Sequence, residues 1–314
     1  MERIESTQNP RVKAARALHT VKGRDRSGLF LCEGEHMVRE ALHAARLESP
    51  LYTPFVLGSA FAVDTLFIAE EQAERYADLV SDAQAAHVVL VPAHVMEAIS
   101  TVKTPQGVAA VVRLQSPRVT QGFTGAGVTP AAFGISGNLD ALEAEEPADA
   151  ALESAADSAV SPSILGEKLV LLEAVQDPGN VGTILRTMDA AGFHGAILAP
   201  GCADPFSPKA LRATMGSIFR VPTLQADSAA QAAAALRDEG YAVVAAELAG
   251  SDFFMRGRLP GRLCLIIGNE GAGVTPETLA IATHRYRLPM KGGAESLNAA
   301  VAAAIMIYDI AYRP

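Results

Sequence analysis

The chain has 314 residues, 49% of them hydrophobic, and its 26 Lys and Arg against 35 Asp and Glu give a net charge of −9. This length is enough for two domains with cores of ordinary size. The absence of an apolar run of about 18 residues excludes a membrane-spanning helix, and the opening MERIESTQNPRVK has no signal-peptide core, so we expect a cytoplasmic protein.

Residues 1–116 alternate between helical and strand patterns, which predicts one α/β unit. The first helix is expected to begin at Pro10, because STQNP offers capping residues before a proline at the first helical position. Helices are expected over 10–19, over 35–46, from about 71 to 83 and over 93–100. Strands are expected over 28–34, 64–70, 87–92 and 107–114.

A local basic patch lies between residues 11 and 26, where only Asp25 opposes six cations. The six are Arg11, Lys13, Arg16, Lys22, Arg24 and Arg26. Such a patch suits the phosphate backbone of a nucleic acid, although a solvated helix face produces the same charge pattern. The helix at 10–19 and an expected loop at 22–26 are therefore candidate nucleic-acid contacts.

Residues 117–163 interrupt the alternation. They are rich in Ala, Gly, Ser and Pro, and they carry seven acids against one base. A segment of this composition buries too little apolar area to offset the entropy of ordering it. We expect it to be a flexible acidic linker.

Residues 164–314 return to alternating strands and helices, and the continuously apolar strands favour a mostly parallel sheet that is buried on both faces. Strands are expected over 168–175, 195–200, 241–247, 262–268 and 285–288. Helices are expected over 180–191, 207–215, 228–239, 275–283 and 295–311. Ligands of such sheets bind at the carboxyl ends of the strands, so the segments that follow the strands are the candidate positions for a functional site.

The first strand exit is VQDPGNVGTILR, at residues 175–186. Pro178 and Gly179 predict a turn, and Asn180 is a suitable N-cap for the helix that follows. Arg186 then stands among apolar neighbours. A guanidinium in that position needs a phosphate or a carboxylate, or else it forms an interhelical salt bridge or reaches solvent.

Two further strand exits carry polar residues in unusual places. LIIGNEGAGV (265–274) puts Glu270 in a glycine-rich turn directly after an apolar strand, without the glycine pattern of a dinucleotide site or a P-loop. LPMKGGAESLNAAVAAAI (288–305) has Ser296 as the expected cap of a long apolar helix and Asn298 in its first turn. The free N–H groups of such a helix start favour an anion.

A metal site is not expected. Cys32, Cys202 and Cys264 are too scattered for a disulfide framework or for metal-ligand spacing. Buried reduced thiols account for them.

Together and in this order, DPGNVGTILRTMDAAG, LIIGNEGAGV and LPMKGGAESLNAAVAAAI resemble the three signature motifs of the SpoU/TrmH family of RNA 2′-O-ribose methyltransferases. The first unit is similar to the substrate-binding domain that many of these enzymes carry, through NPRVKAARAL, FLCEGEHMVREAL and STVKTPQGVAAVV. Periodicity alone would suggest a doubly wound sheet. The resemblance instead implies a C-terminal SPOUT-type α/β domain with a deep trefoil knot over 164–314, and a smaller N-terminal α/β domain over 1–116 that binds RNA, joined by the linker over 117–163.

The resemblance also implies S-adenosylmethionine as the cofactor and a homodimer formed through the C-terminal domain, with the site completed across the interface. The catalytic positions it assigns are Asn180, Arg186, Glu270, Ser296 and Asn298. The cofactor contacts it assigns, largely through the backbone, are Gly268, Asn269, Leu288 and Leu297, with Met290, Glu247 and Leu248 close by.

The implied reaction moves a methyl group to a ribose 2′-OH in structured RNA. Arg186 would grip the adjacent phosphate and stabilise the developing alkoxide, since its high pKa makes a neutral, proton-accepting arginine costly. Ribosomal RNA, in particular 23S rRNA, is the expected substrate because the smallest tRNA-acting relatives often lack the N-terminal domain; tRNA is the alternative. A non-catalytic RNA-binding protein that retains the fold is a second alternative, and failure to bind S-adenosylmethionine would favour it.

Overall fold

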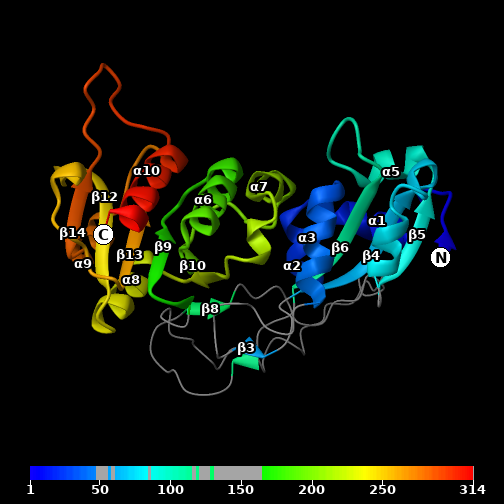
Figure 1. Ribbon diagram of the computed structural model, residues 1–314, viewed down its shortest axis with the longest axis horizontal. Coiled ribbons are helices and arrows are strands. Elements are labelled where there is room, and N and C mark those ends of the chain that lie inside the picture. Colours follow the sequence, from blue (N-terminus) through cyan, green and yellow to red (C-terminus); the bar gives the residue numbers. More distant parts are fainter. Residues whose placement is uncertain are drawn as a thin grey trace.

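The computed structural model describes residues 1–46, 56–57, 61–83, 86–114, 118–119, 128–130 and 165–313. In these ranges two α/β units lie side by side, each built around its own sheet (Figure 1). None of the helices in the described ranges is both long and apolar enough to cross a bilayer.

The first unit contains a mixed sheet with helices on both faces. Its strands are β1 (Glu2–Arg3), β2 (Leu29–Glu33), β4 (Phe61–Ala69), β5 (His87–Val91) and β6 (Val108–Leu114), in the order β1-β5-β4-β6-β2. Its helices are α1 (Pro10–Ala17), α2 (Val21–Ser27), α3 (Glu35–Arg46), α4 (Ala77–Asp82) and α5 (Ala93–Ile99), with a short 3-10 turn, η1 (Glu70–Gln72). β4 pairs parallel with β5 and antiparallel with β6.

Alternate residues of these strands enter two different cores, as the period of two in a strand requires. Phe30 and Cys32 of β2 pack on the face that α3 covers, whereas Leu29 and Leu31 pack with residues of α1 and α5. Burial on both faces explains why these strands are almost continuously apolar.

Most expected elements of this unit are present. The helix expected from about 71 to 83 is not continuous, because α4 covers only Ala77–Asp82 and η1 precedes it, and the short strand β1 was not expected. A further correction concerns residues 22–26. That segment is not a loop but the middle of α2. The Thr20 hydroxyl caps the helix by accepting from Gly23 N at 3.1 Å, and Gly28 ends it with a φ of 66°. Glycine adopts this left-handed conformation at little cost, which is why the helix stops there.

The second unit is a three-layer structure around a mostly parallel sheet. Its strands are β9 (Lys168–Leu172), β10 (Gly195–Leu198), β11 (Thr223–Ala226), β12 (Ala242–Asp252), β13 (Leu263–Ile267) and β14 (His284–Arg287). Its helices are α6 (Pro178–Ala191), α7 (Pro208–Thr214), α8 (Ala229–Asp238), α9 (Pro276–Ile281) and α10 (Ala299–Tyr312), with 3-10 turns η4 (Ser217–Phe219) and η5 (Phe253–Met255). The strand order is β14-β12-β13-β9-β10-β11-β8, and all neighbours are parallel except β8 (Val128–Pro130), which is antiparallel to β11.

The strand β11 was not expected from the sequence, because TLQA is short and only half apolar. β8 falls in the segment expected to be a linker, and so does β7 (Arg118–Val119), which pairs with β3 (Val56–Leu57). The rest of 117–163 lies outside the described residues. The linker and the domain boundaries beside it therefore stay predictions.

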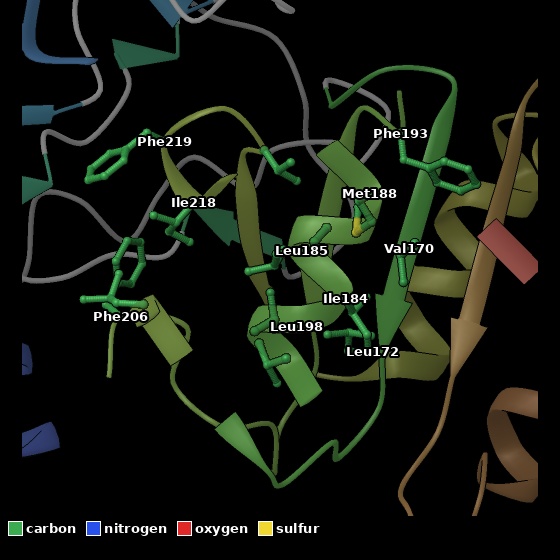
Figure 2. Close-up of a cluster of buried hydrophobic side chains, with 14 of the residues drawn as sticks. Val170, Leu172, Ile184, Leu185, Met188, Phe193, Leu198, Phe206, Ile218 and Phe219 are labelled. Atoms are coloured by element: carbon green, nitrogen blue, oxygen red, sulfur yellow. The ribbon is translucent and has the colours of Figure 1, made fainter. Parts of the chain in front are cut away.

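α6 is the central helix of the second core. Ile184, Leu185 and Met188 pack between Val170 and Leu172 of β9 and Leu198 of β10 (Figure 2). α10 packs against the same helix and against β13, and α7 packs against α6 on the side of the first unit (Figure 1).

The two units share a continuous apolar core. Phe30 and Phe61 of the first unit contact Phe206 and Phe219 of the second, with ring centroids 4.8 Å apart for Phe30–Phe206 and 5.0 Å apart for Phe61–Phe219. All four rings are buried. The side chains Phe206 and Phe219, together with Ile218, extend from the core of the second unit toward the first (Figure 2).

Charged contacts flank this aromatic cluster. The guanidinium of Arg24, which is only 1% exposed, pairs with Asp204 at 2.6 Å and donates to the backbone oxygen of Leu18 at 2.7 Å. Arg220 pairs with Asp189 of its own unit at 2.9 Å and with Glu40 of the first unit. The placement of the first unit beside α7 is thus fixed by buried apolar and ionic contacts.

Candidate active site

The candidate site begins where β9 leads into α6. The N-cap of α6 is Asp177, not the expected Asn180. The Asp177 carboxylate accepts from Gly179 N at 2.6 Å and from Asn180 N at 3.1 Å. Pro178 takes the first helical position, where its lack of an N–H costs nothing because that N–H has no partner within the helix. Since Asp177 does the capping, the buried side chain of Asn180 is available for other contacts.

Asn180 joins the three sequence motifs. Its amide nitrogen donates to the Glu270 carboxylate at 2.8 Å, and its amide oxygen accepts from the Asn298 side chain at 2.9 Å. These three residues, Asn180, Glu270 and Asn298, are called the motif triad below. Residues from three distant parts of the chain therefore meet at one edge of the parallel sheet, as expected for ligand sites in such sheets.

Asn298 has a second task at the start of α10. Its side-chain oxygen accepts from Ala300 N at 2.9 Å and from Val301 N at 3.2 Å, so Asn298 is the N-cap of this helix. The expectation that Ser296 caps the helix was wrong. One amide side chain thus caps α10 with its oxygen and holds Asn180 with its nitrogen.

Glu270 is held as an anion by its donors. Burial tends to raise the pKa of this carboxyl group, but the hydrogen bond from Asn180 and those from backbone groups, including Gln176 N and Asp177 N, outweigh it, and the pKa lies below its usual value. An ionised carboxylate at this point fixes the orientation of the Asn180 amide, because only the nitrogen end of that amide can donate.

A neighbouring ion pair supports the same turn. Lys209 of α7 donates to the Asp177 carboxylate at 2.7 Å. This bond, and then those from the backbone N–H groups of Asn180 and Gly179, lowers the pKa of Asp177. The start of α6 is therefore tied directly to α7.

The glycine-rich turn after β13 is shaped by contacts within the protein. A side chain at Gly268 would place its Cβ 2.2 Å from the backbone carbon of Gly273, so glycine is needed for this close approach. Asn269 stabilises the turn by accepting from Gly271 N and Ala272 N, both at 2.9 Å, and by donating to the backbone oxygen of Ala174 at 2.8 Å.

Glu173 is a polar residue of this region that the sequence reading missed. It is 8% exposed, follows β9 directly, and accepts from Thr275 N at 3.0 Å and from the hydroxyls of Thr275 and Thr278, each at 2.8 Å. Its role is to anchor the turn after β13 and the start of α9. The available signal was the same as for Glu270, a carboxylate placed directly after an apolar strand.

Arg186 lies apart from the motif triad. Six residues of α-helix separate it from Asn180, which corresponds to about 9 Å along the axis and about 120° around it. Its side chain is exposed and makes no hydrogen bond or ion pair with a described residue. Ser296 is likewise exposed. Within one chain, the structure thus brings together three of the five expected catalytic residues.

The expected cofactor residues gather at the exits of three neighbouring strands. Gly268 and Asn269 follow β13, Glu247 and Leu248 lie in an irregular part of β12, and Leu288 and Met290 follow β14. Leu248 is 67% exposed and Leu297 is 38% exposed, so apolar surface is open to a ligand or a partner. Cofactor contact by these residues stays a prediction.

The basic patch of the first unit needs one correction. Arg24 cannot serve as an RNA contact, because its guanidinium is buried in the ion pair with Asp204. Lys13, Lys22 and Arg26 instead line a groove of about 490 Å³ between α1 and α2. Arg16 is exposed on α1, and Arg11 is partly exposed and pairs with Glu2 at 3.4 Å.

Two family models match the chain. One, described as the SpoU rRNA Methylase family, matches residues 167–308. The other, described as the MRM3-like substrate binding domain, matches residues 9–110. The two matches coincide with the two sheets.

Similar proteins align over both units. The chain is 29% identical to the 23S rRNA (guanosine(2553)-2′-O)-methyltransferase RlmP of Bacillus subtilis over 310 residues, which cover 99% of each protein. The crystal structure of an AdoMet-bound rRNA methyltransferase from Sinorhizobium meliloti has a TM-score of 0.72 and 31% identity, covering 99% of this chain and 97% of that one. A 23S rRNA (uridine(2479)-2′-O)-methyltransferase of Streptomyces viridochromogenes is 35% identical over 150 residues, which cover 45% of this chain and 50% of that protein.

Proposed function

This chain belongs to the SpoU rRNA methylase family, and on that premise we propose that it transfers a methyl group from S-adenosylmethionine to a ribose 2′-OH of 23S rRNA. The observation that supports this most directly is the motif triad, because Asn180, Glu270 and Asn298 meet although 90 and 118 residues separate Asn180 from the other two. S-adenosylmethionine supplies the electrophilic methyl group, and this chain's residues have to orient the hydroxyl and deal with its proton.

The triad is a positioning device in this proposal. Its bonds fix the start of α6 relative to the turns after β13 and β14, where the expected cofactor residues lie. Holding the attacking oxygen in line with the methyl carbon supplies much of the rate acceleration in such transfers. The role of Arg186 is to bind the phosphate next to the target ribose and to stabilise charge on the 2′-oxygen as its proton leaves.

We propose further that the active protein is a homodimer through the C-terminal domain, and that Arg186 works in a site completed by the second copy. The exposure of Arg186 and its distance from the triad support this arrangement. Val301, Tyr308 and Tyr312 also form an exposed stripe on α10, at 47%, 43% and 71% exposure. Their spacing places them on one helix face, and an exposed apolar stripe of this kind marks an interaction surface.

The family resemblance also leads us to propose a deep trefoil knot at the C-terminal end of this domain. The return of the chain from β14, at one edge of the sheet, to α10, which packs on α6, supports this topology. The cofactor would then lie among the turns after β12, β13 and β14.

The decisive experiment is methyl transfer from radiolabelled S-adenosylmethionine to rRNA and tRNA purified from a strain that lacks this gene. We expect label in 23S rRNA and none in tRNA, with the modified site mapped as a 2′-O-methyl ribose. Label in tRNA alone would replace the proposed substrate by the alternative one. Calorimetry that detects no S-adenosylmethionine binding would favour a non-catalytic RNA-binding protein.

Arg186→Ala and Arg186→Lys test the assigned chemistry. We expect Arg186→Ala to lower turnover by a factor of 100 or more, roughly 2.7 kcal/mol. Arg186→Lys retains the charge but loses bidentate phosphate binding, so it should recover only a part of the rate. Near-normal turnover in both variants would refute the role.

A further inference from the structure

A second cavity lies where the two units meet, away from the motif triad. Its volume is about 370 Å³, and it is lined from both sides: by Met37, Met96 and Val102 of the first unit and by Arg212 and Met215 of the second. Cavities at domain seams are preferred ligand sites, and this volume falls in the usual range of roughly 300 to 1,000 Å³. We call it the seam cavity.

The walls of the seam cavity suit a flat aromatic ligand. Three of the eight methionines of the chain line it, and thioether sulfur makes favourable contacts with aromatic rings. Met37 and Met96 are buried, whereas Met215 is 42% exposed. Nucleobases offer an aromatic face whatever their identity, so such walls would accept a base without strict sequence selection.

Met215 is held in an uncommon conformation at this wall. Its φ is 48°, a left-handed value that costs energy for a residue with a side chain. The ring nitrogen Nε2 of His36, across the seam, donates to the Met215 backbone oxygen at 3.0 Å. The first unit therefore helps to fix the residue through which the second unit closes the cavity.

Arg212 provides a cation at the same cavity. Its side chain is exposed, Nη1 donates to the Thr101 hydroxyl at 2.7 Å, and it forms no ion pair with any residue in the described ranges. A guanidinium has five N–H donors, so most of them stay available for a phosphate.

α7 connects the seam cavity to the candidate active site. Lys209 precedes Arg212 by three residues, which puts both on one helix face about 4.5 Å apart along the axis. Lys209 binds Asp177, the residue that caps α6 beside Asn180. An RNA strand that reaches the motif triad can therefore follow this face of α7 to the cavity.

We propose that the seam cavity binds one unstacked base of the RNA substrate, a few nucleotides from the methylated ribose, and that Arg212 holds the phosphate of that nucleotide. Splayed-out bases are the usual target of proteins that read folded RNA. This inference rests on the proposed function for the identity of the ligand. A free mononucleotide would satisfy the same chemistry, and the experiment separates the two.

The experiment compares four variants for binding to a 23S rRNA transcript over a range of salt concentrations. Arg212→Ala removes the cation, and Met215→Asn removes an apolar wall while keeping a residue that tolerates positive φ. Thr101→Val removes the bond between Arg212 and the first unit, together with the bond that the Thr101 hydroxyl donates to Glu33, but it keeps the cation. Arg237→Ala, on α8, is the matched loss of an exposed arginine elsewhere.

We expect Arg212→Ala to raise the Kd about tenfold. The salt slope, which is the slope of log Kd against log salt concentration, should fall by about one. Met215→Asn should raise the Kd about fivefold without changing that slope, because it removes contact with a base rather than with a phosphate. Thr101→Val and Arg237→Ala should stay within about twofold of the wild type. A 4-thiouridine-labelled transcript should cross-link to peptides that contain Met215, Met96 or Met37.

The proposal would be overturned if Arg212→Ala bound the transcript with the same Kd as Arg237→Ala. It would also be overturned if Thr101→Val weakened binding as much as Arg212→Ala, since Arg212 would then act only through its hydrogen bond to Thr101. If mononucleotides (AMP, GMP, CMP and UMP) bind at micromolar concentration and Arg212→Ala leaves transcript binding unchanged, the cavity is a site for free nucleotides instead. Methyl transfer is measured in parallel. A wild type that binds RNA but transfers no methyl group would refute the proposed function while these comparisons still decide the seam cavity.

Discussion

The Glu270 carboxylate accepts a hydrogen bond of 2.8 Å from the Asn180 amide, which in turn accepts one of 2.9 Å from Asn298. Asn180 therefore has both ends of its amide engaged, and neither can rotate without losing a bond. Asn180 is buried, whereas Glu270 and Asn298 are exposed, so loss of either neighbour leaves one end of a buried amide unpaired.

Asn298→Asp separates the two tasks of Asn298. An aspartate still caps α10, but it has no N–H to donate to Asn180 and adds a negative charge near Glu270. We expect the free energy of unfolding to change by less than about 1 kcal/mol and methyl transfer to fall about tenfold or more. Asn298→Ala loses the cap as well and should cost a further ~1 kcal/mol. Urea unfolding and methyl-transfer rates measure both quantities; normal turnover in Asn298→Asp would leave Asn298 with only its capping role.

Stability should fall in acid as Asp177 and Glu270 become protonated. Interactions in the folded protein lower the pKa of both carboxyl groups, so each contributes stability above its unfolded pKa, about 3.9 for Asp and about 4.3 for Glu. That contribution is lost as the pH falls through the lowered pKa values of the folded protein. Lys209→Met removes the largest cause of the Asp177 shift. Its urea midpoint should lie below that of the wild type at pH 7, and the gap should narrow toward pH 3; a gap independent of pH would contradict the assignment.

The pair Arg24–Asp204 should matter for stability rather than for RNA contact. Loss of one partner of a buried ion pair leaves an uncompensated charge, so Arg24→Met should lower the free energy of unfolding by about 3 kcal/mol. Arg16→Met, at an exposed position on the neighbouring helix, should stay within about 0.5 kcal/mol of the wild type. Calorimetric unfolding of the two variants decides this. Equal stability in both would mean that Arg24 is not buried in solution.

Gly182 should be indispensable for the contact between α6 and α7. A Cβ there would lie 2.4 Å from the backbone oxygen of Ala210 and 2.7 Å from the Cβ of Ala213, so the helices would have to move apart. We expect Gly182→Ala to cost about 2 kcal/mol or more, through overpacking. Gly257→Ala meets no atom within 4 Å and should be neutral or stabilising by up to ~1 kcal/mol. Urea unfolding distinguishes the two, and a neutral Gly182→Ala would contradict the packing described.

Most of the secondary structure could be predicted because the hydrophobic periodicity and the capping, proline and glycine residues indicate the same element boundaries along this chain. α3 occupies the expected range of 35–46, and Pro10 begins α1 as expected. Prediction failed where the decisive contact is distant. β11 is short and becomes a strand by pairing with β10. In α2 the buried face includes Arg24, whose guanidinium pairs with the partly buried carboxylate of Asp204 in the other unit. Neither partner is visible from the local sequence.

The sequence predicted which residues form the candidate site, but not which hydrogen bonds they make. Asn180, Glu270 and Asn298 were expected near one another, because strand exits of a parallel sheet share an edge. The predicted N-cap was wrong for both helices. Asp177 caps α6 in place of Asn180, and Asn298 caps α10 in place of Ser296, and Asp, Asn and Ser all cap well. The seam cavity could not be expected at all, because its walls come from two units whose docking depends on Phe30, Phe61, Phe206 and Phe219.

The docking of these four phenylalanines limits how the chain can be divided. Each half alone would expose two large aromatic rings that the other half now covers, and such patches favour aggregation. The halves should therefore melt in one cooperative transition rather than two. A chimera that takes its first unit from a relative should fold only if the relative's residues at the positions of Phe30 and Phe61 still pack against Phe206 and Phe219.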